Sequence, residues 1–493
     1  MAGFFVENFG CRATQADGAA LERQFEERGW ERVSTAAQAS VVVLNTCTVT
    51  TGADQDARAA IRRVRRQNPE AQIVVTGCYA QRAPEEIAAL PGVSLVVGNS
   101  HKHQLAEITL RESAPSENVP PSFISLSQLS ENRVLSTENS IFVSDIFAHT
   151  ELLAAPVFDA ANERTRPNLK VQDGCDNRCS FCVIPFVRGQ SRSLEMDRIL
   201  REVNALVAAG YREVVISGIN LGRWGRDLDG RRQTSGLETP GLRRQSSGRG
   251  ETLTAEVQGP RSAFRKPGLE SLIRAILSET ALEKLRISSV EPMDWSDELM
   301  SLMASSPRIA KHAHVPMQSG SDAVLRRMHR KYRPWHYREK IEKIRAAMPD
   351  AAIGADVMVG FPSETEAEFE ATRRVVEELP FTYLHVFTYS ARPGTPAASM
   401  SNQVPVHVAR ERNRILREMA AEKKLAFMRG FVGKSVEAIT LNVVGSDSDG
   451  EFTECLTDNY LKLRLRGRHE PNHWQTAIVQ EVASGSLVGL PRA

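Results

Sequence analysis

Short apolar runs alternate with amphipathic segments over two long stretches of the chain, and this alternation limits the fold more than any other feature. In residues 1–108, the runs FFVENF, SVVVLNT and AQIVVTG have the length and composition of buried strands. The segments between them, DGAALERQFEERG and GADQDARAAIRRVRRQNPE, have helical spacing and stop at Gly or Pro. Such alternation predicts an open parallel sheet covered by helices.

Residues 166–400 repeat the alternation in about six strand–helix units, which predicts a whole or partial (β/α) barrel that binds ligands beyond its strand ends. A stretch rich in Gly, Ser, Arg and Thr at 228–266 interrupts this pattern, and we expect a mobile insertion there. Residues 109–165 are rich in Ser, Asn, Glu and Pro, so we expect a linker with one or two weak strands.

The C-terminal part of the chain has a different pattern. A charged helix is expected at 401–430, and short alternating strands in 431–493 predict a small β-barrel. The expected fold class is therefore α/β: an open parallel N-terminal domain, a central partial barrel and a small C-terminal barrel.

Composition narrows the possible partners and the compartment. The 493 residues carry a formal net charge of only +2, so any contact with a polyanion must come from local basic patches. The chain has no apolar run long enough for a membrane span, and MAGFFVENFGCRAT does not resemble a secretory signal. We therefore expect a cytoplasmic protein with no membrane partner, in which grouped cysteines indicate metal binding or catalysis.

Cys175, Cys179 and Cys182 form the pattern C-x3-C-x2-C. Three thiolates in one loop can wrap a soft metal centre, whereas structural zinc needs a fourth ligand, and no Cys or His follows before His312. A [4Fe-4S] cluster with three protein ligands leaves one iron free to bind a substrate or cofactor. Zinc and a trio without metal are the alternatives.

A second trio, Cys11, Cys47 and Cys78, is dispersed in sequence. Each cysteine follows a strand-type run after one or two small or polar residues. Because parallel strands end along one crevice, we expect these three thiols to converge around a second cluster. For each cysteine alone, a plain buried thiol is the alternative. Cys455 stands alone in the terminal barrel, where we expect it to be a packing residue.

The tight trio resembles the signature of the radical S-adenosylmethionine (SAM) superfamily. This resemblance implies a partial barrel in which the open iron chelates the amino and carboxylate groups of SAM. Reductive cleavage of SAM then yields a 5′-deoxyadenosyl radical. The resemblance also places Phe181 near the adenine of SAM.

Two trios in this order, followed by a small β-module, resemble the methylthiotransferases over nearly the whole chain. LTDNYLKLRL is similar to the TRAM domain, an RNA-binding β-barrel. The family's branches act on threonylcarbamoyladenosine in tRNA, on isopentenyladenosine in tRNA, or on an aspartate of a ribosomal protein. The first branch is the most similar, on the segments TCTVTTGADQDARAAIRR, VTGCYAQ and RRMHRKY.

The resemblance implies a specific reaction, in which a methylthio group is added to C2 of threonylcarbamoyladenosine at tRNA position 37. The cofactors would be two [4Fe-4S] clusters and SAM, with the N-terminal cluster holding the sulfur and the central cluster generating the radical. The partners would be tRNA and a reductase or a flavodoxin- or ferredoxin-type electron donor. A non-catalytic iron–sulfur protein that binds RNA is the remote alternative.

Further cofactor-binding candidates lie at or near predicted strand ends, where a barrel presents its ligands. They are Ser217, Gly218, Ser289, Glu291, Gln318, Asp356 and Gly360. A structural role is the alternative for each. His312 and His314 alternate on one strand and are expected to pack inside the barrel.

Three basic patches on three predicted domains favour a large anionic partner such as tRNA, because guanidinium groups bind phosphates. A solvated helix face is the alternative for any single patch. The candidates are Arg62, Arg63, Arg66, Arg327, Arg330, Lys331, Lys462 and Arg464.

Overall fold

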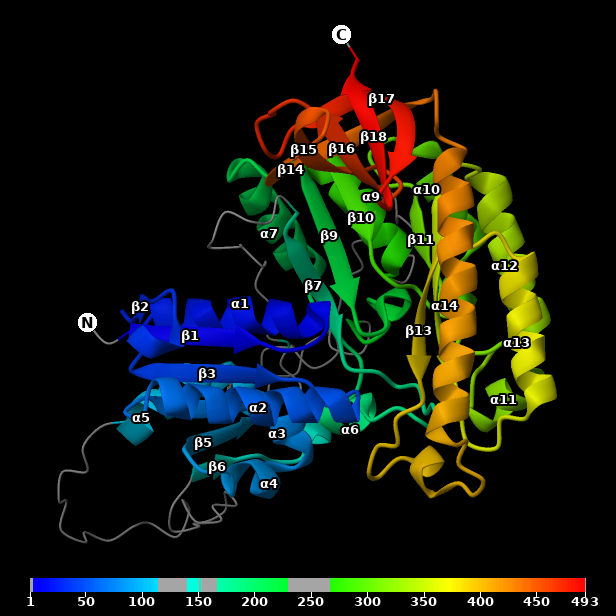
Figure 1. Cartoon of the computed structure of the whole chain (residues 1–493). Coiled ribbons are helices and arrows are strands. Elements are labelled where there is room, and N and C mark those ends of the chain that lie inside the picture. Colours follow the sequence, from blue (N-terminus) through cyan, green and yellow to red (C-terminus); the bar gives the residue numbers. More distant parts are fainter. Residues whose placement is uncertain (1–2, 114–139, 150–151, 153–165, 229–266, 493) are drawn as a thin grey trace, which may run out of the picture.

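The computed structural model describes residues 3–113, 140–149, 152, 166–228 and 267–492. These residues form an N-terminal α/β unit, a central partial barrel and a C-terminal β-barrel (Figure 1). The expected fold class is confirmed. Among the described residues, no helix has the length and apolar character needed to cross a membrane.

The N-terminal unit is a six-stranded sheet in the order β2-β1-β3-β4-β5-β6, with every strand pair parallel. Apolar side chains of the strands pack against α2 on one face and against α1 and α5 on the other. Its strands are β1 Gly3–Asn8, β2 Glu31–Arg32, β3 Val41–Thr46, β4 Gln72–Gly77, β5 Val93–Gly98 and β6 Ser140–Phe142. Its helices are α1 Arg12–Glu26, α2 Thr51–Gln67, α3 Cys78–Arg82, α4 Pro84–Ala88 and α5 Leu105–Ser113.

Part of the segment expected as a linker belongs to this sheet. Helix α5 continues to Ser113, and β6 pairs with β5 through Leu95 and Ser140. The rest of that segment, 114–139, 150–151 and 153–165, lies outside the described residues.

The central unit is a partial barrel. Its two sheets have the strand orders β10-β9-β7-β8 and β11-β12-β13. A parallel β-bridge between Leu285 and Ile309 joins them, and one hydrophobic core contains residues of both sheets. Its strands are β7 Asn168–Asp173, β8 Arg192–Ser193, β9 Glu213–Gly218, β10 Lys284–Ile287, β11 His312–His314, β12 Ala352–Val359 and β13 Tyr383–Thr388. Its helices are α6 Ile184–Arg188, α7 Met196–Ala208, α9 Leu269–Glu279, α10 Asp297–Ser305, α11 Asp322–Arg327, α12 Pro334–Ala347 and α13 Glu366–Glu378. The predicted insertion falls on residues 229–266, outside the described chain.

Helix α14, Val406–Arg429, packs along β13 and leads into the terminal barrel (Figure 1). That barrel is closed in the order β14-β15-β16-β18-β17. Its strands are β14 Ser435–Asp447, β15 Gly450–Thr457, β16 Lys462–Arg466, β17 Trp474–Ala483 and β18 Ser486–Pro491. Cys455 lies in the core of this barrel, as expected for a packing residue.

Candidate active site

The N-terminal cysteines lie at the carboxyl ends of three neighbouring strands. The register pairs Asn8 with Asn45 and Asn45 with Thr76, so β1, β3 and β4 end at the same level. Cys47 and Cys78 directly follow β3 and β4. Gly10, with φ of 103°, lets the loop that carries Cys11 approach closely, because a Cβ there would lie 2.9 Å from Cys47 Sγ. The structure therefore brings this dispersed trio to one edge of the sheet.

Burial differs among these three thiols. Cys11 is exposed, whereas Cys47 and Cys78 are buried. Burial, together with the neighbouring Cys78, raises the pKa of Cys47 to about 12, so the metal-free thiol keeps its proton. Asn99 donates its side-chain amide to Cys78 Sγ at 3.6 Å. A metal would have to displace the Cys47 proton on binding.

The second trio lies in the loop between β7 and α6, and its sulfurs accept hydrogen bonds. The Asn177 backbone N–H and the Asn220 side-chain amide donate to Cys175 Sγ at 3.4 and 3.7 Å. Arg330 Nη1 donates to Cys179 Sγ at 3.2 Å. Such donors stabilise thiolates and tune the clusters that thiolates hold.

The two trios lie next to each other. Cys78 packs against Val183 and Val187, and Val183 directly follows Cys182. Cys78 therefore lies against the residue that adjoins Cys182 and against Val187 of α6.

Buried charged residues stabilise the contact between the N-terminal and central units. Arg188, the last residue of α6, donates to Asp17 of α1 at 2.9 Å and to Asp173 of β7 at 3.0 Å. Although burial alone would raise it, Arg188, Lys102 and Lys170 together lower the pKa of Asp17 to about 2. The N-terminal and central units thus share an ionised cluster beside the cysteines.

The spacing of the thiols is informative about the metal. Among the described residues, neither cysteine trio has its three sulfurs all within 4.8 Å of one another. A single tetrahedral zinc with bonds of about 2.3 Å would hold thiolates about 3.8 Å apart. A cluster tolerates wider spacing because each thiolate binds a different iron. The geometry therefore does not match a single zinc ion held by all three thiolates of either trio.

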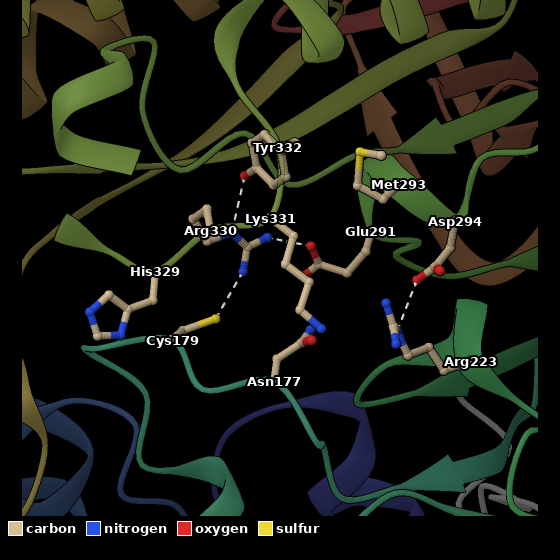
Figure 2. A pocket seen from close by; sticks show the side chains of 10 residues that line it. All are labelled: Asn177, Cys179, Arg223, Glu291, Met293, Asp294, His329, Arg330, Lys331 and Tyr332. Atoms are coloured by element: carbon tan, nitrogen blue, oxygen red, sulfur yellow. Dashed lines mark hydrogen bonds and ion pairs between the residues drawn. The ribbon is translucent and has the colours of Figure 1, made fainter. Parts of the chain in front are cut away.

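A pocket opens beside Cys179, and Arg330 lies at its centre (Figure 2). The Arg330 guanidinium forms an ion pair with Glu291 and donates to the Tyr332 hydroxyl at 3.3 Å, in addition to its bond with Cys179. Met293 and Asp294 complete one wall of this pocket. Opposed charges thus meet next to the tight trio.

Two family models match the chain. Residues 3–98 match the model described as "Uncharacterized protein family UPF0004", and residues 169–376 match the Radical SAM superfamily. A relative from Aquifex aeolicus, named threonylcarbamoyladenosine tRNA methylthiotransferase MtaB, is 34% identical and is aligned over 94% of this chain and 97% of its own. This chain belongs to the radical SAM methylthiotransferase family. It is therefore an enzyme that uses SAM and [4Fe-4S] clusters.

Other relatives carry two different names. The Bacillus subtilis MtaB is 33% identical, aligned over 95% of this chain and 92% of its own. A Thermobifida fusca protein named tRNA-2-methylthio-N(6)-dimethylallyladenosine synthase is 32% identical, aligned over 90% of this chain and 79% of its own. The solved structure of TsrM, a radical SAM methyltransferase from Kitasatospora setae, is similar with a TM-score of 0.52 at 14% identity, covering 81% of this chain and 74% of that one. This last likeness concerns the fold alone.

The structure of this methylthiotransferase contradicts the prediction that Arg330 binds RNA. Its side chain is only 5% exposed, because it is paired with Glu291 and bonded to the Cys179 sulfur inside the pocket. The prediction failed because the sequence shows a charge but not its partner. Lys331 lines the same pocket and is exposed, whereas Arg327 is held by Glu368 through two bonds of 2.8 and 2.9 Å.

The other basic candidates of the methylthiotransferase are more accessible. On α2, Arg62 and Arg66 are exposed, and Arg63 is exposed but forms an ion pair with Glu7. Lys462 is exposed on β16, and Arg464 is half-buried over the Phe452 ring. Binding of RNA by these residues stays a prediction.

The structure does not bring the cofactor-binding candidates together in one pocket. Phe181 is half-buried with its ring 6.5 Å from that of Phe361, Ser217 is buried, and Ser289 is half-buried. Of the candidates, Glu291 alone lines the pocket of Figure 2.

Three candidates make backbone contacts within the barrel. A Cβ at Gly218 would lie 2.8 Å from Gln172 Oε1, and one at Gly360 would lie 2.6 Å from the Cβ of Ala409 in α14. Gln318, with φ of 62°, donates its backbone N–H to the Asp356 carbonyl oxygen. These contacts explain the glycines by close packing, and a role in SAM binding stays a prediction.

Asp356 belongs to a group that sequence reasoning missed. His314, Asp356 and His385 extend from β11, β12 and β13, with ligand atoms within 4.8 Å of one another. His312 packs as expected, with its ring stacked on Tyr383. His385 alternates with Tyr383 on β13, and that alternation was the signal that could have identified it.

Proposed function

We propose that this methylthiotransferase adds a methylthio group to C2 of threonylcarbamoyladenosine at position 37 of tRNA. The observation that carries the proposal is the packing of Cys78 against the residues that follow Cys182, because transfer of sulfur to a radical site needs two adjacent centres. The relatives named for this activity, which are similar over nearly the whole chain, support the choice of substrate.

We assign one [4Fe-4S] cluster to Cys11, Cys47 and Cys78, and the other to Cys175, Cys179 and Cys182. All six are free thiols, and hydrogen-bond donors reach the sulfurs of both trios. When bound, the clusters and SAM supply the radical and sulfur chemistry.

The chain's own residues bind and orient the reactants. In the pocket beside Cys179, the Glu291 carboxylate and the Arg330 guanidinium match the ammonium and carboxylate groups of SAM's methionine part. The buried Tyr332 ring would shield one side of that pocket from water. Asn220 and Asn177 would steady Cys175 through their hydrogen bonds to its sulfur.

The partner side of the proposal is tRNA. Arg62, Arg63 and Arg66 on α2 would contact its backbone, together with Lys331. The closed terminal barrel would act as a TRAM-type RNA-binding module through Lys462 and Arg464. A flavodoxin- or ferredoxin-type protein or a reductase would deliver electrons, and the reaction would take place in the cytoplasm.

Nucleoside mass analysis of tRNA tests the substrate. A strain without this gene should accumulate threonylcarbamoyladenosine that lacks the methylthio group, and the intact gene should restore it. Loss of methylthio-isopentenyladenosine instead would favour the activity named for the Thermobifida fusca relative. An unchanged tRNA profile with loss of a modified ribosomal aspartate would favour the protein-modifying branch. Absence of 5′-deoxyadenosine from the reduced enzyme with SAM would leave only an iron–sulfur protein that binds RNA.

A further inference from the structure

In the view of Figure 1, β13 lies between the N-terminal unit and α14. His385 and Phe387 alternate on one face of this strand, and both are exposed, Phe387 by 48%. The other face of the strand is covered by α14, whose Asn413 donates to the Val386 carbonyl oxygen at 3.0 Å. Barrel interiors are normally filled by side chains, so an open stretch of inner wall indicates space for a ligand.

Polar groups from neighbouring strands border this space. His314 and Asp356 lie beside His385, and the two imidazole rings are 5.6 Å apart. Asp356 is 3.4 Å from His314 Nε2. The Phe387 ring is 6.5 Å from that of His385 and extends the wall with an aromatic surface.

Arg12, at the start of α1, belongs to the same neighbourhood. It is exposed and donates to the Tyr460 hydroxyl at 3.2 Å. The Tyr460 ring is in turn 6.2 Å from the ring of Tyr383, two residues before His385 on β13. Arg12 also directly follows Cys11, so its backbone adjoins a cysteine of the N-terminal trio.

The charges around this space do not balance. Within the described residues, Arg12 has no carboxylate within 4.0 Å, and Asp356 lies within 4.0 Å of His314 but forms no ion pair with His385. The nearby Arg286 is already neutralised by Glu213 at 2.6 Å. The exposed Arg12 guanidinium can therefore form charge-assisted hydrogen bonds to an anionic ligand.

We propose, on the basis of the proposed function, that this space binds the threonylcarbamoyl group of the substrate. Arg12 and His385 bind its carboxylate, Asp356 accepts a hydrogen bond from its N–H groups, and Phe387 offers an aromatic surface to the base. Binding of the carboxylate at Arg12 holds the nucleoside beside Cys11, where the sulfur is held in the proposed function. An isopentenyl group carries no charge and would leave Arg12 and His385 without an acceptor, so the site selects against it.

The test uses the reconstituted holoenzyme and anticodon stem-loop RNAs that carry either threonylcarbamoyl- or isopentenyladenosine. Arg12→Gln should raise KM for the threonylcarbamoyl substrate by about 10- to 100-fold, since a hydrogen bond to a charged group is lost. Arg12→Lys should have a KM between those of Arg12→Gln and the wild type. His385→Phe should reduce the preference of the enzyme for the threonylcarbamoyl RNA over the isopentenyl RNA. Arg23→Gln, on the same helix but paired with Glu202 away from β13, is the matched control. Iron content is measured in every variant, and Arg23→Gln should keep the wild-type KM, iron content and RNA-independent 5′-deoxyadenosine formation.

The possible outcomes distinguish a failure of this binding site from a failure of the proposed reaction. If the wild-type enzyme does not convert the threonylcarbamoyl RNA, the proposed function fails and this site fails with it. If it does convert it and Arg12→Gln keeps the wild-type KM, only the site is overturned. One zinc per holoenzyme chain that is lost in His385→Phe would also overturn it, because His314, Asp356 and His385 would then bind a metal instead.

Discussion

Arg392, in the loop after β13, donates to Asp54 of α2 at 2.8 Å, and both side chains are buried. The same guanidinium donates at 3.0 Å to the carbonyl oxygen of Thr48, which directly follows Cys47. A residue of the central unit thus holds the backbone beside an N-terminal cysteine. Together with the Arg188–Asp17 pair, this contact sets the N-terminal trio against the central one.

Arg392→Gln should loosen the Cys47 loop and lower the free energy of unfolding by about 1.5–3 kcal/mol, because Asp54 keeps a second partner in Arg82. With the trios less well positioned, more 5′-deoxyadenosine should form per methylthiolated product. Thermal unfolding and product ratios measure the two effects. Arg414→Gln, which breaks only exposed pairs on α14, is the control. A destabilised variant with an unchanged product ratio would contradict the positioning role.

The two cysteine trios should be separable by mutation. Cys78→Ser should remove about four irons per chain and abolish methylthiolation, while SAM cleavage continues. Cys179→Ser should remove a similar amount of iron and abolish SAM cleavage as well. Iron analysis and the yield of 5′-deoxyadenosine test both variants, with Cys455→Ala in the terminal barrel as the control. Full iron content in Cys78→Ser would argue against the N-terminal cluster assignment.

Arg330→Gln should weaken SAM binding, because the variant removes the guanidinium that would bind the SAM carboxylate and leaves Glu291 without its cation. We expect the apparent Kd for SAM to rise by about 10-fold or more, measured anaerobically without RNA. Arg326→Gln is the control, since Arg326 is exposed and pairs with Asp322 within α11. Unchanged SAM affinity in Arg330→Gln would show that the pocket beside Cys179 is not the SAM site.

Loss of a phosphate contact should change the salt dependence of tRNA binding. Arg62→Gln and Arg66→Gln should each reduce the slope of log K against log salt by about 0.7–0.9, because one fewer counterion is released. Arg373→Gln, which breaks an exposed pair on α13, should leave the slope unchanged. Filter binding at several salt concentrations measures this. Equal slopes in all the variants would remove α2 from the proposed tRNA surface.

The strand pattern made much of this architecture predictable. Runs such as SVVVLNT and AQIVVTG became β3 and β4 almost residue for residue, because a buried parallel strand needs a continuous apolar run. Strand β6 was harder to foresee. It has three residues and exists through its pairing with β5, from which it is separated by more than forty residues of chain.

The sequence by itself determined where Cys11, Cys47 and Cys78 are placed, because a residue that follows a buried strand must lie near that strand's end, and parallel strands end together. Only the tertiary structure decided what the arginines do. Arg62 and Arg330 are both arginines, but the Arg62 side chain is exposed to solvent, whereas the Arg330 side chain is paired with Glu291. The physical reason is the sequence separation of the interacting residues. A strand pattern depends on neighbours in the chain, whereas the environment of a buried charge depends on partners that folding brings from distant segments.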